Sequence, residues 1–185
     1  MARITRRKAA LTGAALMAGA AGEANAFSFR FTAIEGGPLP LAQFRGKAML
    51  VVNTASFCGY TPQYASLQRL HQRHEARGLV VLGVPSTDFN QESHDAAAIK
   101  QFCDANYDVT FPMTTPEHIK GATAHPFFAW LAAHAGGPPR WNFHKYLVAR
   151  DGRSVTAFAT SVEPEAPALV RAIEAALRQN APPAS

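Results

Sequence analysis

The sequence predicts an α/β domain in which a central mixed sheet is flanked by helices. Two continuous apolar runs, at 48–54 and 79–85, have the length and the β-branched content of buried strands. A helical pattern lies between them, and this β-α-β order predicts that the two strands are parallel. The turn signals Gly36-Gly37-Pro38 and Asp151-Gly152 each predict an antiparallel hairpin, so parallel and antiparallel pairing should occur in one domain.

The first half of the domain should contain a hairpin, a strand, a helix and a second strand. Apolar and polar residues alternate at 27–32, which predicts a half-buried strand, and 39–41 begins its return. After the first buried strand, Thr61 and Pro62 predict a helix start with the threonine hydroxyl as N-cap. Gly78 ends this helix, because glycine readily adopts the left-handed conformation found after helix C-termini.

The second half should contain a helix at 95–106, a short strand at 111–113, a helix from 125, hairpin strands at 143–149 and 154–159, and a helix at 163–178. No repeat or interdomain linker interrupts this order, so we expect one domain. The order fits a thioredoxin-like fold with an N-terminal hairpin extension. In such a sheet, the end of the first core strand is a natural place for a reactive group.

Residues 1–26 have the features of an export signal. A basic start that includes Arg6-Arg7 precedes a short apolar run, and Ala24-Asn25-Ala26 fits the small-x-small cleavage pattern. The run is shorter than the about 20 residues that span a bilayer, so we expect no stable membrane anchor. The arginine pair matches a twin-arginine signal, and general secretion is the alternative route. We therefore expect an exported, periplasmic protein whose domain covers 27–185.

The charge distribution argues against a nucleic-acid partner. The whole chain of 185 residues carries a net charge of +5, but the four basic residues and one acid of segment 1–26 account for +3 of it. The remaining +2 is too small to suggest a basic binding patch. A chain of this length can bury a proper core as one ordinary domain.

Cys58 and Cys103 are the two cysteines. Cys58 lies just before a predicted helix, where unpaired backbone N–H groups favour an anion and therefore the thiolate. These local features are equally compatible with a reactive cysteine and with a buried structural one. An exported protein could also hold the two cysteines as a static disulfide. The sequence has no C-x-x-C motif or zinc-ligand spacing, and a solvated helix face explains His71 and His74, so we expect no metal and no cofactor.

Four stretches resemble the glutathione peroxidase family: VNTASFCGYT at 52–61, GVPSTDFNQE at 83–92, FPM at 111–113 and WNFHKYLV at 141–148. The resemblance implies that Cys58 is the peroxidatic cysteine and that Gln91, Trp141 and Asn142 surround it. Each of these three side chains offers an uncharged N–H donor, which can stabilise a thiolate and the oxygen that leaves a split O–O bond. Neighbours on a strand point to opposite faces, so Trp141 and Asn142 can both reach Cys58 only from a turn before the strand begins at about 143.

The sequence departs from the family pattern in front of Gln91. The family usually has Asn and Gln where Thr87 and Asp88 stand, and the run 85–91 is one residue short. The shortening could redirect the Gln91 amide, which leaves Asn90 as the alternative for this role.

Cys103 resembles the resolving cysteine of the family members that use thioredoxin. The implied cycle oxidises Cys58 to a sulfenic acid, condenses it with Cys103 to a disulfide, and reduces the disulfide with a thioredoxin-like or low-molecular-weight thiol. A buried structural role is the alternative for Cys103. Segment 132–140 is short where tetrameric members carry an insertion, so the resemblance implies a monomer with an open site for bulky lipid hydroperoxides.

Three functions therefore compete. The first is a thiol-dependent peroxidase that reduces hydrogen peroxide and organic or lipid hydroperoxides. The second is a non-enzymatic peroxide sensor or redox relay that uses the Cys58–Cys103 pair. The third is a copper-handling or disulfide-exchange protein, which the absence of a second cysteine close to Cys58 disfavours.

Overall fold

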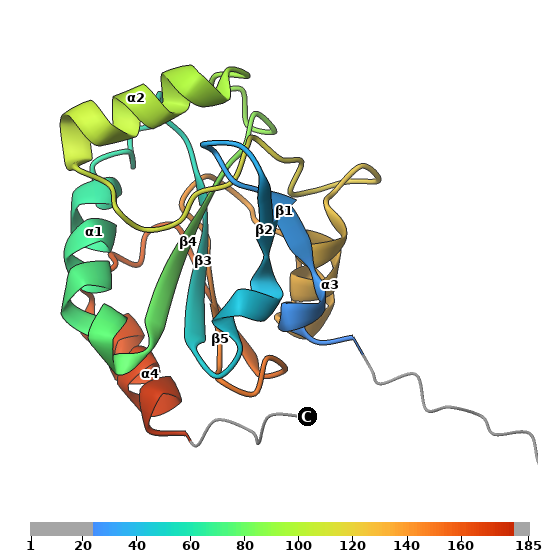
Figure 1. Cartoon of the computed structure of the whole chain (residues 1–185), viewed down its shortest axis with the longest axis vertical. Helices are drawn as coiled ribbons and strands as arrows, with labels where there is room; N and C mark the ends of the chain where they lie inside the picture. Colours follow the sequence, from blue (N-terminus) through green and yellow to red (C-terminus); the bar gives the residue numbers. More distant parts are fainter. Residues whose placement is uncertain (1–23, 180–185) are drawn as a thin grey trace, which may run out of the picture.

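The computed structural model describes residues 24–179, with a four-stranded mixed sheet at the centre (Figure 1). In sheet order the strands are β4 (Leu79–Pro85), β3 (Ala48–Thr54), β5 (Lys145–Val148) and β6 (Val155–Phe158). β3 pairs in parallel with β4 and antiparallel with β5, and β5 pairs antiparallel with β6. The predicted mixed sheet is confirmed, and both buried strands have the predicted bounds.

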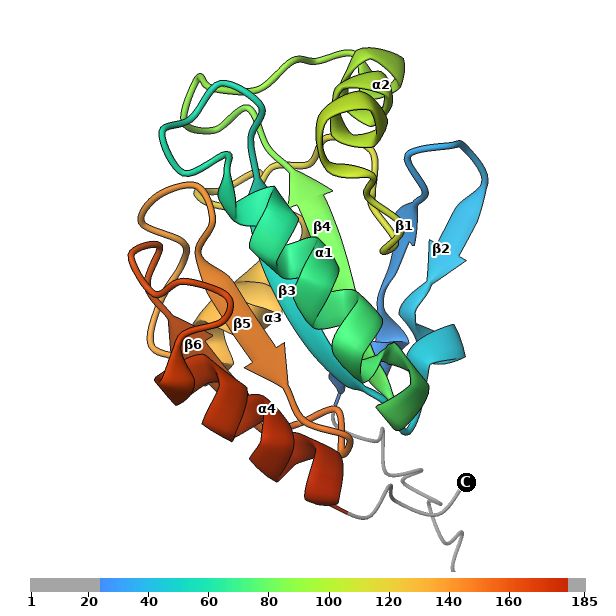
Figure 2. The same cartoon turned by 90° about the vertical axis from the view of Figure 1, so that its left-hand side faces the viewer.

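The central strand β3 is buried on both faces, which explains its continuous apolar sequence. Leu50 and Val52 belong to one core cluster, whereas Met49 and Val51 belong to the other. The first cluster lies under α1 (Gln63–His74) and α4 (Pro167–Arg178), and the second lies under α3 (Pro126–His134) and the N-terminal hairpin. Figure 2 shows α1 and α4 side by side over one face of the sheet, with α2 (Ala96–Tyr107) beyond the end to which β4 points.

The N-terminal hairpin is shorter than its sequence pattern predicts. β1 (Arg30–Thr32) pairs with β2 (Pro38–Pro40), and η2 (Leu41–Phe44) follows. The first part of the predicted strand is instead the 3₁₀ turn η1 (Ala26–Ser28). This turn forms because the Asn25 side chain accepts a hydrogen bond from the Phe27 N–H at 3.0 Å and caps it.

Residues 24–26, the predicted cleavage motif, pack against the domain. The Ala26 N–H donates to the Gly152 carbonyl oxygen at 2.8 Å, and the Trp130 indole donates to the Ala24 carbonyl oxygen at 3.0 Å. Ala26 is fully buried. The rest of the predicted leader, 1–23, lies outside the described residues.

α1 begins later than predicted because the Thr61 hydroxyl is used elsewhere. The N-cap of α1 is Pro62, which makes no side-chain hydrogen bond, and the first helical residue is Gln63. The helix continues into η3 (Glu75–Arg77) and ends at Gly78, whose φ of 95° is left-handed as predicted.

Two further predictions need correction. The segment predicted as a strand at 111–113 makes only one isolated bridge, of Met113 with Gly83, because Pro112 has no N–H to continue a ladder. The last helix begins at Pro167 rather than at 163, with proline at its first turn.

The two histidines of α1 are buried, not solvated as the sequence predicts. His71 and His74 are 4% and 2% exposed, and burial lowers the pKa of each. Within residues 24–179, no three metal-binding side chains form a cluster. None of the helices described there has the length and apolar character needed to cross a membrane.

Candidate active site

Cys58 lies in the turn between β3 and α1. Its backbone N–H donates to the Thr61 hydroxyl at 3.0 Å, and that hydroxyl donates to the Ala55 carbonyl oxygen at 2.9 Å. The Tyr60 N–H donates to Cys58 Sγ at 3.4 Å. Cys58 is buried in this turn, with 8% of the residue exposed.

Gln91 and Asn142 are bonded to each other. Asn142 Nδ2 donates to Gln91 Oε1 at 2.9 Å, across 51 residues of sequence. The Phe57 N–H donates to the Gln91 carbonyl oxygen at 3.0 Å, which attaches the Gln91 loop to the turn of Cys58. Asn90 is exposed with a left-handed φ of 56°. Gln91, rather than its neighbour, therefore meets Asn142.

Trp141 lies on the surface beside these amides. The residue is 40% exposed, and its ring contacts the Phe89 ring, with centroids 5.1 Å apart. Phe57 and Tyr60 are also exposed, so within the described part of the chain the large exposed hydrophobic side chains gather around Cys58. A hollow of about 430 Å³ adjoins this surface and is lined by Tyr60, Arg140, Trp141, His144, Ala159, Thr160 and Ser161.

The segment 141–143 forms a turn, as the sequence argument requires, and β5 begins only at Lys145. Phe143 has a left-handed φ of 60°, which reverses the chain locally. Asn142 is fully buried by this turn, while Trp141 remains exposed.

The five predicted site residues are only partly assembled. Gln91 and Asn142 are in direct contact, and Trp141 shares a hollow with Tyr60, the residue whose N–H contacts Sγ. Within residues 24–179, the Sγ of Cys58 accepts a hydrogen bond from the Tyr60 N–H and from none of the three predicted side-chain donors.

Cys103 is on α2, fully buried, and is not bonded to Cys58. Burial raises the pKa of the Cys103 thiol to about 11; the Tyr64 hydroxyl opposes this rise and the Glu92 carboxylate adds to it. The thiol is therefore neutral near pH 7 and is inaccessible while α2 stays folded.

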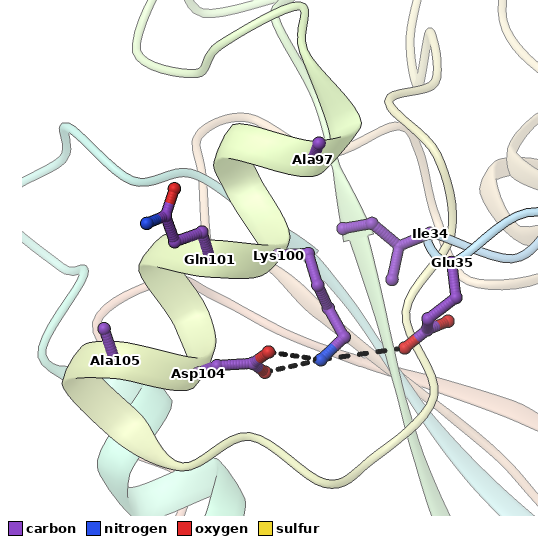
Figure 3. Close-up of a pocket in the computed structure, with 7 residues that line it drawn as sticks. All are labelled: Ile34, Glu35, Ala97, Lys100, Gln101, Asp104 and Ala105. Atoms are coloured by element: carbon purple, nitrogen blue, oxygen red, sulfur yellow. Dashed lines mark hydrogen bonds and ion pairs between the residues drawn. The ribbon is translucent and has the colours of Figure 1, made fainter.

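A larger hollow, about 670 Å³, lies between the outer face of α2 and the tip of the N-terminal hairpin (Figure 3). Lys100 Nζ bridges it, bonding both carboxylate oxygens of Asp104 at 2.6 Å and approaching Glu35 at 3.8 Å. None of the five predicted site residues lines this hollow. It is therefore distinct from the candidate active site.

Sequence reasoning missed three residues that hold the turn at 141–143, namely Asn53, Lys145 and Thr160. Each donates to one carbonyl oxygen of the turn. A signal was present for two of them, because Asn53 and Lys145 are polar residues inside otherwise apolar strand sequences. A buried polar side chain of this kind needs a hydrogen-bond partner.

Comparison with known proteins identifies the family of the chain. The sequence model of the glutathione peroxidase family matches residues 26–132. Hydroperoxy fatty acid reductase gpx1 of Synechocystis is 40% identical over 150 residues, which cover 75% of this chain and 89% of the relative. A glutathione peroxidase of Lactococcus lactis is 38% identical over 146 residues, covering 76% and 93%.

Solved structures support the same assignment. The apo crystal structure of Trgpx has a TM-score of 0.71 and 32% identity, and the match covers 87% of this chain and all of that one. A secreted disulfide oxidoreductase of Mycobacterium tuberculosis has a TM-score of 0.56 at 15% identity, with 83% and 98% covered, a likeness in fold alone. The fold is thioredoxin-like, and the chain belongs to the glutathione peroxidase family.

Proposed function

We propose that the chain is a thiol-dependent peroxidase that reduces hydrogen peroxide and organic hydroperoxides at Cys58. The observation that carries this proposal is the hydrogen bond between Asn142 and Gln91, because it gathers two amides from distant segments next to the Cys58 turn. Membership of the glutathione peroxidase family supports the same reaction.

The first step oxidises Cys58. Its thiolate attacks the terminal oxygen of ROOH, so that an S–O bond forms while the O–O bond breaks. The leaving RO⁻ takes a proton from water to become ROH, and Cys58 is left as a sulfenic acid.

The neutral N–H groups near the turn stabilise this step. The Gln91 NH₂ and the Trp141 indole N–H have no hydrogen-bond partner among residues 24–179, so both are free to donate to the departing oxygen. One N–H of the Asn142 amide is used on Gln91 and the other remains.

The second step uses Cys103. Its sulfur attacks the sulfur of the sulfenic acid, an S–S bond forms, and hydroxide leaves and combines with the thiol proton as water. A thioredoxin-like dithiol or a low-molecular-weight thiol then reduces the disulfide by exchange. Because Cys103 is buried and a disulfide needs Cα atoms within about 7 Å, α2 must open locally before this step.

The hollow beside the site favours bulky organic hydroperoxides as substrates. The Trp141 and Tyr60 rings line it together with Arg140, which forms no ion pair among the described residues. Aromatic rings suit an acyl chain and a guanidinium suits a carboxylate. Fatty acid hydroperoxides combine the two, and one relative is named hydroperoxy fatty acid reductase.

The test treats fully reduced protein with one equivalent of hydrogen peroxide and maps the product by mass spectrometry. We expect a Cys58–Cys103 disulfide in the native sequence and a Cys58 sulfenic acid in Cys103→Ser. Cys58→Ser should consume no peroxide. Peroxide consumption by Cys58→Ser would refute the assigned nucleophile, and a lasting sulfenic or sulfinic Cys58 in the native sequence would remove Cys103 from the cycle.

A second candidate, a non-enzymatic sensor or redox relay, is favoured by the complete burial of Cys103. If α2 opens rarely, the oxidised state persists and a partner protein could respond to it. Steady-state turnover with an added dithiol separates the two functions. A peroxidase consumes many equivalents of peroxide, whereas a relay stops after one.

Export to the periplasm and a monomeric state complete the proposal. The basic start, the apolar run and the Ala24-Asn25-Ala26 motif support export, and the short segment 132–140 supports a monomer. Cell fractionation followed by N-terminal sequencing tests the first, and size-exclusion chromatography with light scattering tests the second. An intact N-terminus in the cytoplasmic fraction, or a tetramer, would contradict them.

A further inference from the structure

We propose that Asn53 is a positioning residue that holds the turn of Trp141 and Asn142 against the strand leading into Cys58. The inference rests on the proposed function, because it assigns Asn53 to the support of two of the donors used there. Asn53 makes no contact with the Cys58 sulfur and would act only through the turn.

Asn53 is the penultimate residue of β3 and is bonded to the turn through both its side chain and its backbone. Its Nδ2 donates to the Trp141 carbonyl oxygen at 3.0 Å. Its own carbonyl oxygen accepts from the Phe143 N–H at 2.6 Å. These two contacts bracket Asn142, so the backbone of that residue is fixed relative to β3.

The two remaining carbonyl oxygens of the turn are held by other elements. The Asn142 oxygen accepts from the Thr160 hydroxyl at 2.8 Å, and the Phe143 oxygen accepts from Lys145 Nζ at 2.9 Å. Each carbonyl oxygen from 141 to 143 therefore has its own donor. Asn53 supplies the donor that comes from the strand preceding Cys58. It therefore sets the distance between the turn at 141–143 and the turn of Cys58.

The turn needs such support because its conformation is strained. Phe143 has a φ of 60°, a region that bulky side chains avoid unless their surroundings hold them there. If the turn relaxed to extended backbone, Trp141 and Asn142 would point to opposite faces of a strand. Only one of them could then face Cys58.

The buried amide of Asn53 is better explained by positioning than by packing. The side chain is 1% exposed, and its Oδ1 has no partner among the described residues. A buried acceptor without a partner destabilises a fold, and an apolar side chain would avoid that cost. What an apolar side chain could not supply is the N–H that reaches Trp141.

The experiment compares Asn53→Asp and Asn53→Ala with the control Gln68→Ala. The aspartate keeps the shape but places an acceptor against the Trp141 carbonyl, whereas the alanine only removes the donor. Gln68 is also a buried amide that joins distant segments, through its two hydrogen bonds with Thr110. It lies in α1, and its hydrogen bonds go to Thr110 rather than to residues 141–143.

The readout is the second-order rate of Cys58 oxidation by hydrogen peroxide, followed by stopped flow at a temperature where circular dichroism shows every variant folded. We expect both Asn53 variants to be slower by about tenfold or more, and Gln68→Ala to remain within about twofold of the native rate. Native rates in both Asn53 variants would overturn the inference. If the aspartate variant does not fold, Asn53→Ala decides alone.

A double-mutant cycle separates positioning from a general structural effect. In a Trp141→Phe/Asn142→Ala background, which removes both donors that Asn53 positions, Asn53→Ala should slow the reaction by no more than about twofold. An undiminished loss in that background would show that Asn53 acts independently of the turn and would overturn the inference. Failure of the proposed function would look different, because native Cys58 would then react no faster than a free thiol.

Discussion

Asn142 Nδ2 donates a hydrogen bond to Gln91 Oε1 at 2.9 Å, joining the turn before β5 to the loop after β4. This contact decides how the two amides are oriented. The Gln91 oxygen is occupied, so its NH₂ faces away from Asn142 and is free to donate. Two amides that lie 51 residues apart in the sequence thereby become a directed pair of donors next to the turn of Cys58.

Replacing Asn142 with aspartate should impair peroxide reduction without changing the shape of the side chain. The carboxylate cannot donate to Gln91 Oε1, and its negative charge opposes charge on the departing oxygen. We expect the second-order rate with peroxide to fall by about a hundredfold, the scale seen for loss of one transition-state donor. Stopped-flow oxidation of reduced protein measures it, with Gln68→Ala as the control. A rate within threefold of the native protein would contradict the donor role.

Cys103 should be far less reactive than Cys58 in the folded, reduced protein. Its thiol is fully buried, and burial raises its pKa to about 11, so little thiolate exists at pH 8. We expect iodoacetamide to label Cys58 at least about a hundredfold faster, and the difference to disappear in urea. A mass-spectrometric time course gives both rates. Equal labelling in the native state would mean that α2 opens freely.

Acidification should destabilise the protein partly through His144. Burial, with help from Lys145 and Arg140, lowers the pKa of His144 from 6.5 to about 4. The unfolded chain then binds a proton between these pH values that the folded chain does not. Stability is therefore full above about pH 6.5 and is lost as the pH falls toward 4, by at most about 3 kcal/mol from this residue.

Urea unfolding at pH 7 and pH 5 tests this account. His144→Gln should lose less stability than the native protein between the two pH values. The exposed His94, replaced in the same way, is the matched control and should lose as much as the native protein. An equal loss in the native protein and in His144→Gln would refute the assignment.

A chain that begins at Phe27 should be less stable than one that begins at Ala24. It lacks the Asn25 cap and the bond from Trp130 to the Ala24 carbonyl oxygen. The Phe27 nitrogen is then the chain terminus instead of a peptide N–H. With about 1 kcal/mol for a cap and about 1 kcal/mol for a hydrogen bond, we expect a loss of about 2 kcal/mol in the free energy of unfolding. Urea denaturation of the two chains measures the difference, and identical midpoints would contradict it.

The same contacts have a consequence for processing at Ala24-Asn25-Ala26. A peptidase needs an accessible, extended segment, whereas here Ala26 is buried within a capped 3₁₀ turn. The bond after Ala26 should be cut quickly in unfolded chain and slowly in folded chain. Incubating both forms with signal peptidase and measuring intact masses tests this, and equal rates would show that the turn opens readily.

The strands were predictable where the chain is buried on both faces. At 48–54 and 79–85 the apolar sequence is continuous, so the position and length of each strand were clear. Prediction failed where one polar side chain had two possible partners. Thr61 was expected to cap a helix, but its hydroxyl bonds Cys58 and Ala55 instead. Asn25, inside a supposed cleavage motif, caps a turn that shortens the first strand.

The sequence by itself determined the α/β order of the elements, the family and the position of Cys58 after the first core strand, since these depend on local periodicity and contiguous motifs. Only the tertiary structure decided that Gln91 rather than Asn90 meets Asn142, that Cys103 is buried, and that Asn53 holds Trp141 from 88 residues away. The physical reason is that a hydrogen bond depends on distance and direction between groups in space. Spacing along the chain determines neither the distance nor the direction.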